Sequence, residues 1–350
     1  MHKTEDYYYS DTFELESGTS LPGFQLRFST YGKLNEARDN VIWVCHALTA
    51  NANFLDWWGG LFGKDRLYNP DDYFVVCANM LGSCYGSTGP LSVNPKTGQP
   101  FYHTFPLLTN RDIVRAFDLL RQHLEIEKIH TLIGGSLGGQ HALEWAIMQP
   151  ERIRHLIQLC SNAQHSPWGI AFNESQRMAI ANDPSWQESH PEAGLQGMRT
   201  ARSIALLSYR HYTTYQKTQA EITESRLDNY RASSYQQYQG DKLARRFNAF
   251  SYWTLSKAMD SHHVGRDRGG VMVALQSIRA KALFIGVSTD ILFPVSEQRL
   301  LAAHVKGAEL SVIDSDYGHD GFLIEVEALK QEISRFYASS ACQSVYSKSS

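Results

Sequence analysis

Short apolar segments separated by turn residues occur throughout the first 160 residues of the chain. Four of them are nearly all apolar: 40–45 (NVIWVC), 73–78 (YFVVCA), 128–134 (KIHTLIG) and 154–160 (RHLIQLC). Continuous apolar segments of this length are typical of strands covered on both faces. Residues 24–31 alternate between apolar and polar positions instead, which predicts an antiparallel strand.

Helical patterns lie between these strands. Residues 112–124 place their apolar side chains on one stripe, and residues 140–148 form a second helical segment that ends before Pro150. Alternation of strand and helix predicts a mostly parallel central sheet with helices on both sides.

The pattern changes between residues 164 and 265, where the chain is rich in Gln, Tyr, Ser and Arg and has no segment of the buried-strand type. Residues 171–182, 194–209 and 245–259 look helical. Strand-like segments return at 282–287 (ALFIGV) and 309–313 (ELSVI). We therefore expect a catalytic α/β core of residues 1–163 and 266–350, with residues 164–265 inserted as a helical cap (lid) domain.

Composition and charge narrow the classes of function. The chain of 350 residues is 43% hydrophobic and 20% charged, as in a globular protein with a normal core. Its 33 Lys and Arg against 36 Asp and Glu give a net charge of −3, which argues against a nucleic-acid partner. The basic pair Arg245-Arg246 is interpreted as a solvated surface and not as a phosphate site.

The cysteines and the N-terminus bear on the cellular location. Five cysteines without CxxC spacing predict neither a disulfide framework nor a zinc site. The N-terminus is polar, and no run of 18 apolar residues occurs, so we expect a cytoplasmic protein without a membrane anchor. The adjacent pair His262-His263 does not predict a metal site, because neighbouring side chains point apart.

The most specific local motif is GGSLGG at residues 134–139, which follows one predicted strand and precedes a helix. Gly134, Ser136 and Gly138 have the spacing of a nucleophile elbow, a tight turn that presents a serine hydroxyl. Glycines flank the serine because such a turn leaves no room for Cβ atoms. Ser136 is therefore predicted to be a catalytic nucleophile.

A serine needs a base, and the base needs an orienting acid. Asp290 follows the predicted strand at 282–287, and His319 follows the strand at 309–313. The order Ser, acid, His, with each residue after a strand, is that of the α/β-hydrolase fold. We expect Ser136, Asp290 and His319 to form a catalytic triad. The backbone N–H groups of Leu48 and Leu137 are the expected oxyanion hole.

Several longer segments resemble the homoserine O-acetyltransferase family of α/β-hydrolase enzymes over nearly the whole chain. They are HALTA at 46–50, NMLGSCYGSTGPLSVNPKTG at 79–98, FPLLTNRDIVRA at 105–116, GGSLGGQHALEWA at 134–146, RFNAFSYWTLSKAMD at 246–260, GVSTDILFPVSEQ at 286–298 and DYGHDGFLIE at 316–325.

The resemblance implies an activity and its substrates. Acetyl-CoA would acylate Ser136, and the hydroxyl of L-homoserine would then take the acetyl group with His319 as base. Two half-reactions imply ping-pong kinetics, at the entry to methionine biosynthesis. No bound cofactor or metal is implied, and the family typically forms homodimers through cap helices.

The resemblance also suggests residues that bind the acceptor. It implies that Arg177 holds the substrate carboxylate, that Asp320 holds the substrate ammonium, and that Tyr209 lies near the acyl group. Arg177 could equally be a solvated helix residue, and Asp320 a turn residue. Departures from the family pattern, including Asn248 where an acidic residue is frequent, leave the triad intact.

Other functions remain open on the sequence alone. A transferase of the same family could use succinyl-CoA or L-serine, since one methylene changes binding by only about 1–3 kcal/mol. A serine esterase or other hydrolase would use the same triad, with water in place of the acceptor. An inactive relative that only binds ligands is disfavoured by the complete triad.

Overall fold

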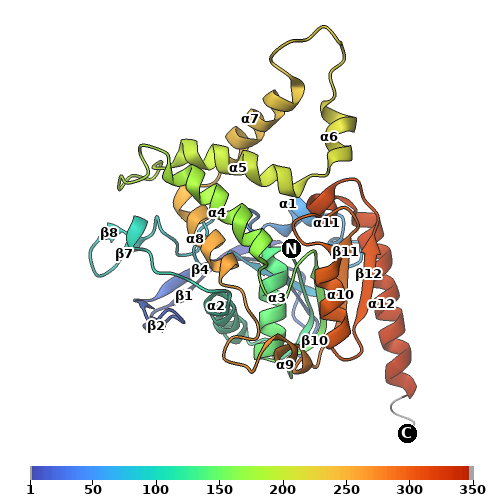
Figure 1. The fold of residues 1–350 in the computed structure, drawn as a ribbon. Helices are drawn as coiled ribbons and strands as arrows, with labels where there is room; N and C mark the ends of the chain where they lie inside the picture. The colour runs from blue at the N-terminus through green and yellow to red at the C-terminus, as the bar shows by residue number, and fades with distance from the viewer. Residues whose placement is uncertain (1, 347–350) are drawn as a thin grey trace.

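A single eight-stranded sheet forms the centre of the computed structural model, which describes residues 2–346 (Figure 1). Its strand order is β1-β4-β6-β5-β9-β10-β11-β12. The strands are β1 (Lys3–Tyr9), β4 (Phe24–Tyr31), β5 (Val41–Cys45), β6 (Phe74–Ala78), β9 (Ile129–Gly135), β10 (Ile153–Leu159), β11 (Lys281–Val287) and β12 (Glu309–Ile313). β4 pairs antiparallel with β1 and β6, and the other neighbours are parallel.

Every strand predicted from the sequence forms in this sheet. The prediction missed β1, whose polar sequence KTEDYYY leaves most of its residues exposed or half-buried. This strand lies at the edge of the sheet and pairs only with β4 along its whole length. Two short hairpins lie outside the sheet: β2 (Phe13–Glu14) with β3 (Ser20–Leu21), and β7 (Val93–Asn94) with β8 (Gln99–Pro100).

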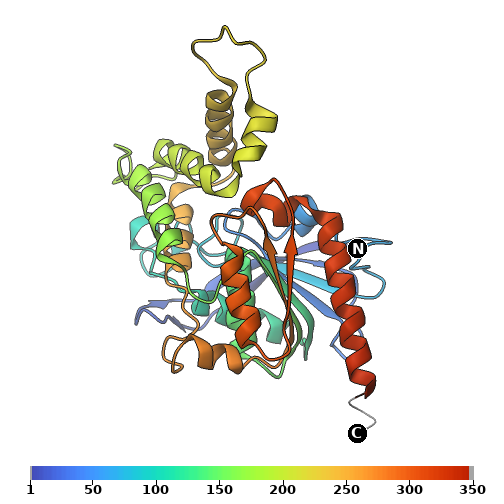
Figure 2. The same cartoon turned by 45° about the vertical axis from the view of Figure 1, so that its right-hand side comes forward.

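Helices cover both faces of the sheet, and each face has its own hydrophobic cluster (Figure 2). One face packs against α2 (Asn110–His123), α3 (Leu137–Met148), α9 (Val271–Gln276) and α10 (Val295–His304). The other packs against α1 (Phe54–Trp58), α11 (Gly321–Ile324) and α12 (Val326–Tyr346). Two short 3₁₀ turns complete the core, η1 (Tyr102–Thr104) and η2 (Gly318–Asp320).

The segment 164–265, here called the cap, contains five helices that lie at one end of the core (Figure 1). They are α4 (Pro167–Ala181), α5 (Leu195–Tyr209), α6 (Tyr212–Gln219), α7 (Arg231–Ala244) and α8 (Ala249–Asp260). α4 packs on α5, and α5 packs on α7. Helices α6 and α7, with the loop between them, project away from the rest of the molecule (Figure 2).

The two ends of the cap lie side by side. Gln164 and His263 form an isolated antiparallel bridge, and the Val264 N–H donates to the Ala163 carbonyl at 3.0 Å. The cap is inserted between β10 and β11, which are neighbours in the sheet. Its chain therefore leaves and re-enters the core at one place.

None of the helices within residues 2–346 is both long enough and apolar enough to cross a bilayer.

Candidate active site

Ser136 lies at the sharp turn between β9 and α3, with φ 57° and ψ −126°. A non-glycine residue at positive φ is strained, and such strain concentrates at functional sites. The turn is held by hydrogen bonds from the Ser136 N–H to the Leu159 carbonyl at 3.0 Å and from the Ser161 hydroxyl to the Ser136 carbonyl at 2.8 Å. Helix α3 then begins at Leu137, directly after the serine.

The glycines around Ser136 are required by close backbone packing. A Cβ atom on Gly134 would lie 2.3 Å from the Gly138 carbonyl oxygen, and one on Gly138 would lie 2.1 Å from the Cys45 carbonyl oxygen. Neither backbone atom can move far, because both belong to the elbow or to the adjacent strand β5. The structure thus explains why glycine is needed at both positions, as the sequence motif predicts.

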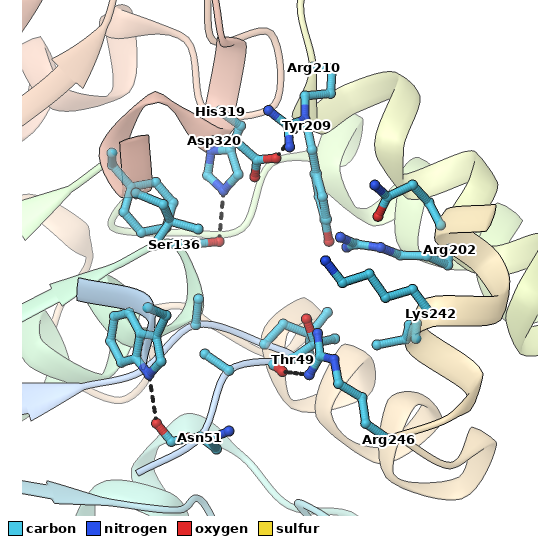
Figure 3. A pocket seen from close by; sticks show the side chains of 18 of the residues that line it. Thr49, Asn51, Ser136, Arg202, Tyr209, Arg210, Lys242, Arg246, His319 and Asp320 are labelled. Atoms are coloured by element: carbon cyan, nitrogen blue, oxygen red, sulfur yellow. Dashed lines mark hydrogen bonds and ion pairs between the residues drawn. The ribbon is translucent and has the colours of Figure 1, made fainter. Parts of the chain in front are cut away.

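His319 connects the serine to the acid. Its Nε2 lies 2.9 Å from the Ser136 Oγ (Figure 3), and its Nδ1 lies 2.7 Å from Asp290 Oδ2. The three residues come from three places in the chain that the sheet brings together: the turn after β9, the loop after β11 and the turn after β12. All three are buried. Neutral histidine with Nδ1–H donating to Asp290 leaves Nε2 free to accept the serine proton.

Asp290 is fixed by the loop that carries it. Its Oδ1 accepts hydrogen bonds from the backbone N–H groups of Leu292 at 2.8 Å and Phe293 at 2.9 Å. Its other oxygen is left for His319. The ring of Phe293 stacks on the ring of His319, with centroids 5.2 Å apart. The carboxylate and the imidazole therefore have little freedom to turn away from each other.

The protonation of His319 depends on opposing effects. Burial lowers the pKa of His319, but the charge of Asp290, its hydrogen bond and the nearby charge of Asp320 outweigh burial. The net result is a pKa raised above the ordinary value of 6.5. The imidazole is thereby a stronger base for the serine proton.

A cavity of about 380 Å³ opens above Ser136 and His319, between the core and the cap. Leu48 belongs to its wall, on the loop after β5. The backbone N–H of Leu137 is the first of α3, where no intrahelical carbonyl is available to accept it. The positive end of the helix dipole adds to the field at this point. Leu137 thus adjoins the serine and Leu48 lies in the wall of the same cavity, and their role as oxyanion donors stays a prediction.

Asp320 and Tyr209 also line the cavity (Figure 3). The ring of Tyr209 lies 5.7 Å from the ring of His319, centroid to centroid. Asp320 Oδ2 lies 3.0 Å from the Nε of Arg210, which also belongs to the wall. The family resemblance implied that Asp320 and Tyr209 lie near the substrate, and in the structure both line the cavity that contains Ser136 and His319.

The prediction for Arg177 is corrected by the structure. Its side chain is only 1% exposed and is not part of the cavity wall. The guanidinium is engaged inside the cap, with Asp260 Oδ2 at 2.5 Å, Glu174 Oε2 at 2.6 Å and the Ser256 hydroxyl at 3.0 Å. These acceptors use the donors that a substrate carboxylate would need, so Arg177 stabilises the packing of α4 on α8.

Besides Arg210, which pairs with Asp320, three cations line the cavity: Arg202 on α5, Lys242 on α7 and Arg246 just after α7 (Figure 3). Arg202 and Lys242 were not predicted from the sequence, and Arg246 was predicted to be a solvated surface residue. Arg202 lies seven residues before Tyr209, two turns along the same helix. That spacing puts both on one face of α5, and it was the signal available in the sequence.

Metal ligands are a further possibility to test. Cys160 Sγ, an Asp290 oxygen and a His319 nitrogen lie within 4.8 Å of one another. Both nitrogens of His319 are already engaged by the triad, and burial raises the pKa of the Cys160 thiol well above its usual value. His262 Nε2 lies against the Asn162 carbonyl at 3.1 Å, away from the cavity. The Cys160, Asp290 and His319 cluster and the His262 side chain are therefore both engaged by protein partners, and neither is arranged to bind a metal ion.

Comparison with known proteins gives consistent results. Residues 40–326 match the model of the alpha/beta hydrolase fold family. The chain is 56% identical over 333 residues to a homoserine O-acetyltransferase of Cyclobacterium marinum, covering 95% of each chain. It is 42% identical over 337 residues to a homoserine O-acetyltransferase of Trichormus variabilis, covering 95% of this chain and 94% of the other.

Solved structures agree on the fold. A homoserine O-acetyltransferase from Bacillus anthracis superposes with a TM-score of 0.89 at 25% identity, over 96% of this chain and 97% of the other. Esterase E22 superposes with a TM-score of 0.87 at 22% identity, over 96% and 100% of the two chains. The esterase likeness concerns the fold alone.

Proposed function

Because this chain belongs to the homoserine O-acetyltransferase family of α/β-hydrolase enzymes, and is therefore a transferase, we propose that it moves an acetyl group from acetyl-CoA to the hydroxyl of L-homoserine. The observation that carries the proposal is the hydrogen-bonded array of Ser136, His319 and Asp290, of which Ser136 and His319 line the floor of the cavity. The product would be O-acetylhomoserine, and the step would belong to methionine biosynthesis. The acyl group is held covalently between donor and acceptor, so the reaction is ping-pong and needs no bound cofactor.

The first half-reaction forms the acyl-enzyme. His319 Nε2 takes the proton of the Ser136 hydroxyl while Oγ attacks the thioester carbonyl. The N–H groups of Leu48 and Leu137 stabilise the oxyanion of the tetrahedral intermediate. When the intermediate collapses, the C–S bond breaks, and the protonated His319 gives its proton to the leaving CoA sulfur.

The second half-reaction repeats these steps with the acceptor. The hydroxyl of L-homoserine gives its proton to His319 and attacks the acyl carbon on Ser136. The ester bond to Oγ breaks, and the serine takes the proton back from His319. Asp290 stabilises the imidazolium in both half-reactions and is not itself protonated.

Opposite charges in the same cavity favour an α-amino acid as acceptor. Asp320 offers a carboxylate for the substrate ammonium, although it is shared with Arg210. Arg202 offers a guanidinium for the substrate carboxylate, and in the described part of the chain it has no carboxylate partner; its Cζ lies 5.4 Å from the centre of the Tyr209 ring. A planar guanidinium can hold a carboxylate through two parallel hydrogen bonds. We assign to Arg202 the role first predicted for Arg177.

The test is CoA release by the purified protein, with acetyl-CoA or succinyl-CoA as donor and L-homoserine, L-serine or water as acceptor. Acetyl-CoA turnover that requires L-homoserine supports the proposal. Preference for succinyl-CoA or L-serine would keep the triad chemistry and replace the substrates. CoA release at the same rate with water alone would identify a hydrolase and overturn the proposal.

Homodimerisation through the cap helices is part of the same proposal. Large apolar side chains are exposed on α5 to α7 and the loop between α6 and α7, namely Leu207 at 56%, Tyr212 at 72%, Ile222 at 85%, Leu227 at 89% and Tyr238 at 53%. Several large apolar side chains exposed on one part of a protein are favourable for an interface.

A further inference from the structure

The residues of the cavity are graded in exposure from its floor to its mouth. Ser136 and His319 at the floor are 6% and 3% exposed. Arg202, Tyr209, Arg210 and Asp320 are half-buried, whereas Lys242, Arg246 and Asp56 are exposed. The cavity therefore has an inner zone around the triad and an outer zone with two cations and one carboxylate.

Lys242 lies in the last turn of α7 and points into the cavity, opposite Ser136 and His319 (Figure 3). No carboxylate forms an ion pair with its ammonium among the residues that the structure describes. The neighbouring Asp241 pairs with Arg199 instead. An exposed lysine that faces a cavity without a partner is available to an anionic ligand.

Arg246 is held in place at the same mouth. Its Nη1 donates to the Thr49 carbonyl and to the Tyr85 hydroxyl, both at 2.5 Å, so it joins the cap to the loop after β5. A guanidinium has five N–H donors, and these contacts use one nitrogen. The rest of the group is oriented without being neutralised, because neither partner is charged.

The proposed donor is too large to be enclosed by the cavity. The whole cavity has about 380 Å³, near the lower end of the roughly 300–1,000 Å³ of cavities that enclose drug-sized ligands, and CoA is larger than such ligands. CoA carries its thioester at one end of a long flexible arm and its phosphates on the nucleotide at the other end. With the thioester carbonyl at Ser136, the arm must leave through the mouth, and the phosphates must lie at or beyond it.

From this geometry we propose that Lys242 and Arg246 form a subsite for the phosphates of the CoA donor. This inference rests on the proposed function, since it assumes an acyl-CoA substrate. Two cations against the single carboxylate of Asp56 make the mouth favourable for a polyanion. Arg202, in the inner zone, is left for the acceptor. The two residues of the basic pair Arg245-Arg246 therefore differ in position, since Arg246 belongs to the cavity wall and Arg245 does not.

The experiment compares acetyl-CoA with S-acetyl-N-acetylcysteamine, a thioester that has the end of the same arm but no phosphates. The variants are Lys242→Gln, Arg246→Gln and the control Arg245→Gln, which removes an adjacent exposed cation outside the wall. Each subsite variant is expected to raise the KM for acetyl-CoA by about three- to tenfold, as for one lost charge-assisted contact near the surface. The KM for the truncated donor should stay unchanged in both subsite variants. Lys242→Arg keeps the positive charge and should have the wild-type KM for acetyl-CoA. The control Arg245→Gln should change the KM for neither donor.

Two results would overturn the subsite. A parallel rise in both KM values would mean that the two residues shape the cavity rather than bind phosphate. An unchanged KM for acetyl-CoA in both variants would place the phosphates elsewhere.

A direct binding measurement tests the phosphate subsite independently of the proposed acetyl transfer to L-homoserine. Adenosine 3′,5′-bisphosphate, which carries phosphates but no thioester, is titrated calorimetrically into each variant. Weaker binding by Lys242→Gln and Arg246→Gln than by Arg245→Gln supports the subsite even if L-homoserine proves not to be the acceptor. Equal binding by all variants would contradict the subsite even if acetyl transfer to L-homoserine is observed.

Discussion

At the scale of single residues, the position of each triad member follows from the strand that precedes it. Ser136, Asp290 and His319 each follow the carboxyl end of a parallel strand, and parallel strands end at one edge of a sheet. This is why the sequence was sufficient to find all three. Arg177 and Arg202 could not be separated in the same way. Both lie on cap helices, and the rotation of a helix relative to the core depends on tertiary packing.

Replacement of Ser136 by alanine tests the nucleophile. Wild-type protein with acetyl-CoA and no acceptor should gain the mass of one acetyl group on Ser136, and Ser136→Ala should not. Transfer should fall by at least about a thousandfold, because the variant lacks the hydroxyl that His319 contacts and activates. Circular dichroism should show an intact fold. Transfer at a near wild-type rate would remove Ser136 from the mechanism.

The raised pKa of His319 predicts an acidic limb in the pH profile. The free base is the active form, so kcat/KM for acetyl-CoA should fall as pH drops through a pKa above 6.5. Asp290→Asn removes the carboxylate charge that raises the pKa of His319, so the limb should move to lower pH. The maximum rate should fall by about 10³- to 10⁴-fold, since the imidazole is no longer oriented. An unshifted limb in Asp290→Asn would mean that another group titrates.

Two arginine variants test the reassignment of the acceptor site. Arg202→Gln should raise the KM for L-homoserine by about ten- to a hundredfold, the effect of losing a charge-assisted pair in a half-buried site. Arg177→Lys should leave that KM unchanged and lower the urea midpoint of unfolding, because lysine cannot reproduce the fork that contacts Asp260, Glu174 and Ser256. The opposite pattern would restore Arg177 as the substrate ligand.

At the scale of elements, sequence patterns identified the buried strands well and the polar cap helices poorly. Helix α5 was predicted nearly in full, over 194–209, whereas the segment predicted at 171–182 misses the first turn of α4, which begins at Pro167. Helices α6 and α7 were missed, since few of their residues are buried: only Thr214 in α6, and Gly240 and Leu243 in α7. A predicted helix over 245–259 proved to start at Ala249, after a break between α7 and α8.

The start of α8 provides a test of element stability. Asn248 is the N-cap of α8, and its Oδ1 accepts the Ser251 N–H at 2.8 Å. Asn248→Ala should reduce the free energy of unfolding by about 1 kcal/mol, measured by urea denaturation. Asn248→Asp should keep the stability, because aspartate caps as well as asparagine and its charge suits the helix N-terminus. Equal losses in both variants would assign the effect to packing.

At the scale of the whole molecule, the core and the cap contribute different things to one cavity. The core supplies Ser136, His319 and the loop after β5, and the cap supplies Arg202, Lys242 and Arg246. The sequence indicated this division through its change of pattern after residue 163. It could not indicate which cap residues face the core, because that depends on how α5 and α7 pack on each other.

The exposed apolar side chains of the cap predict a dimer that can be measured. Leu207→Glu combined with Tyr212→Glu should convert a dimer to a monomer in sedimentation experiments, because charges would be buried at the interface. Val273→Glu is the matched control, since Val273 is equally exposed, at 54%, but lies on α9. A wild-type protein that sediments as a monomer would contradict the predicted dimer, as would a double variant that stays dimeric.

The paired ends of the cap have a consequence for how such enzymes diversify. Since hydrogen bonds from Val264 to Ala163 and from His165 to His262 pair the two ends of the cap, the chain enters and leaves this segment at a single place. A gene segment encoding another cap could replace it in one recombination event without displacing β10 or β11. The triad and the cap's share of the cavity wall can therefore be inherited separately, and a chimaera of this core with a relative's cap should lose the substrate contacts of Arg202, Lys242 and Arg246 and keep that of Asp320.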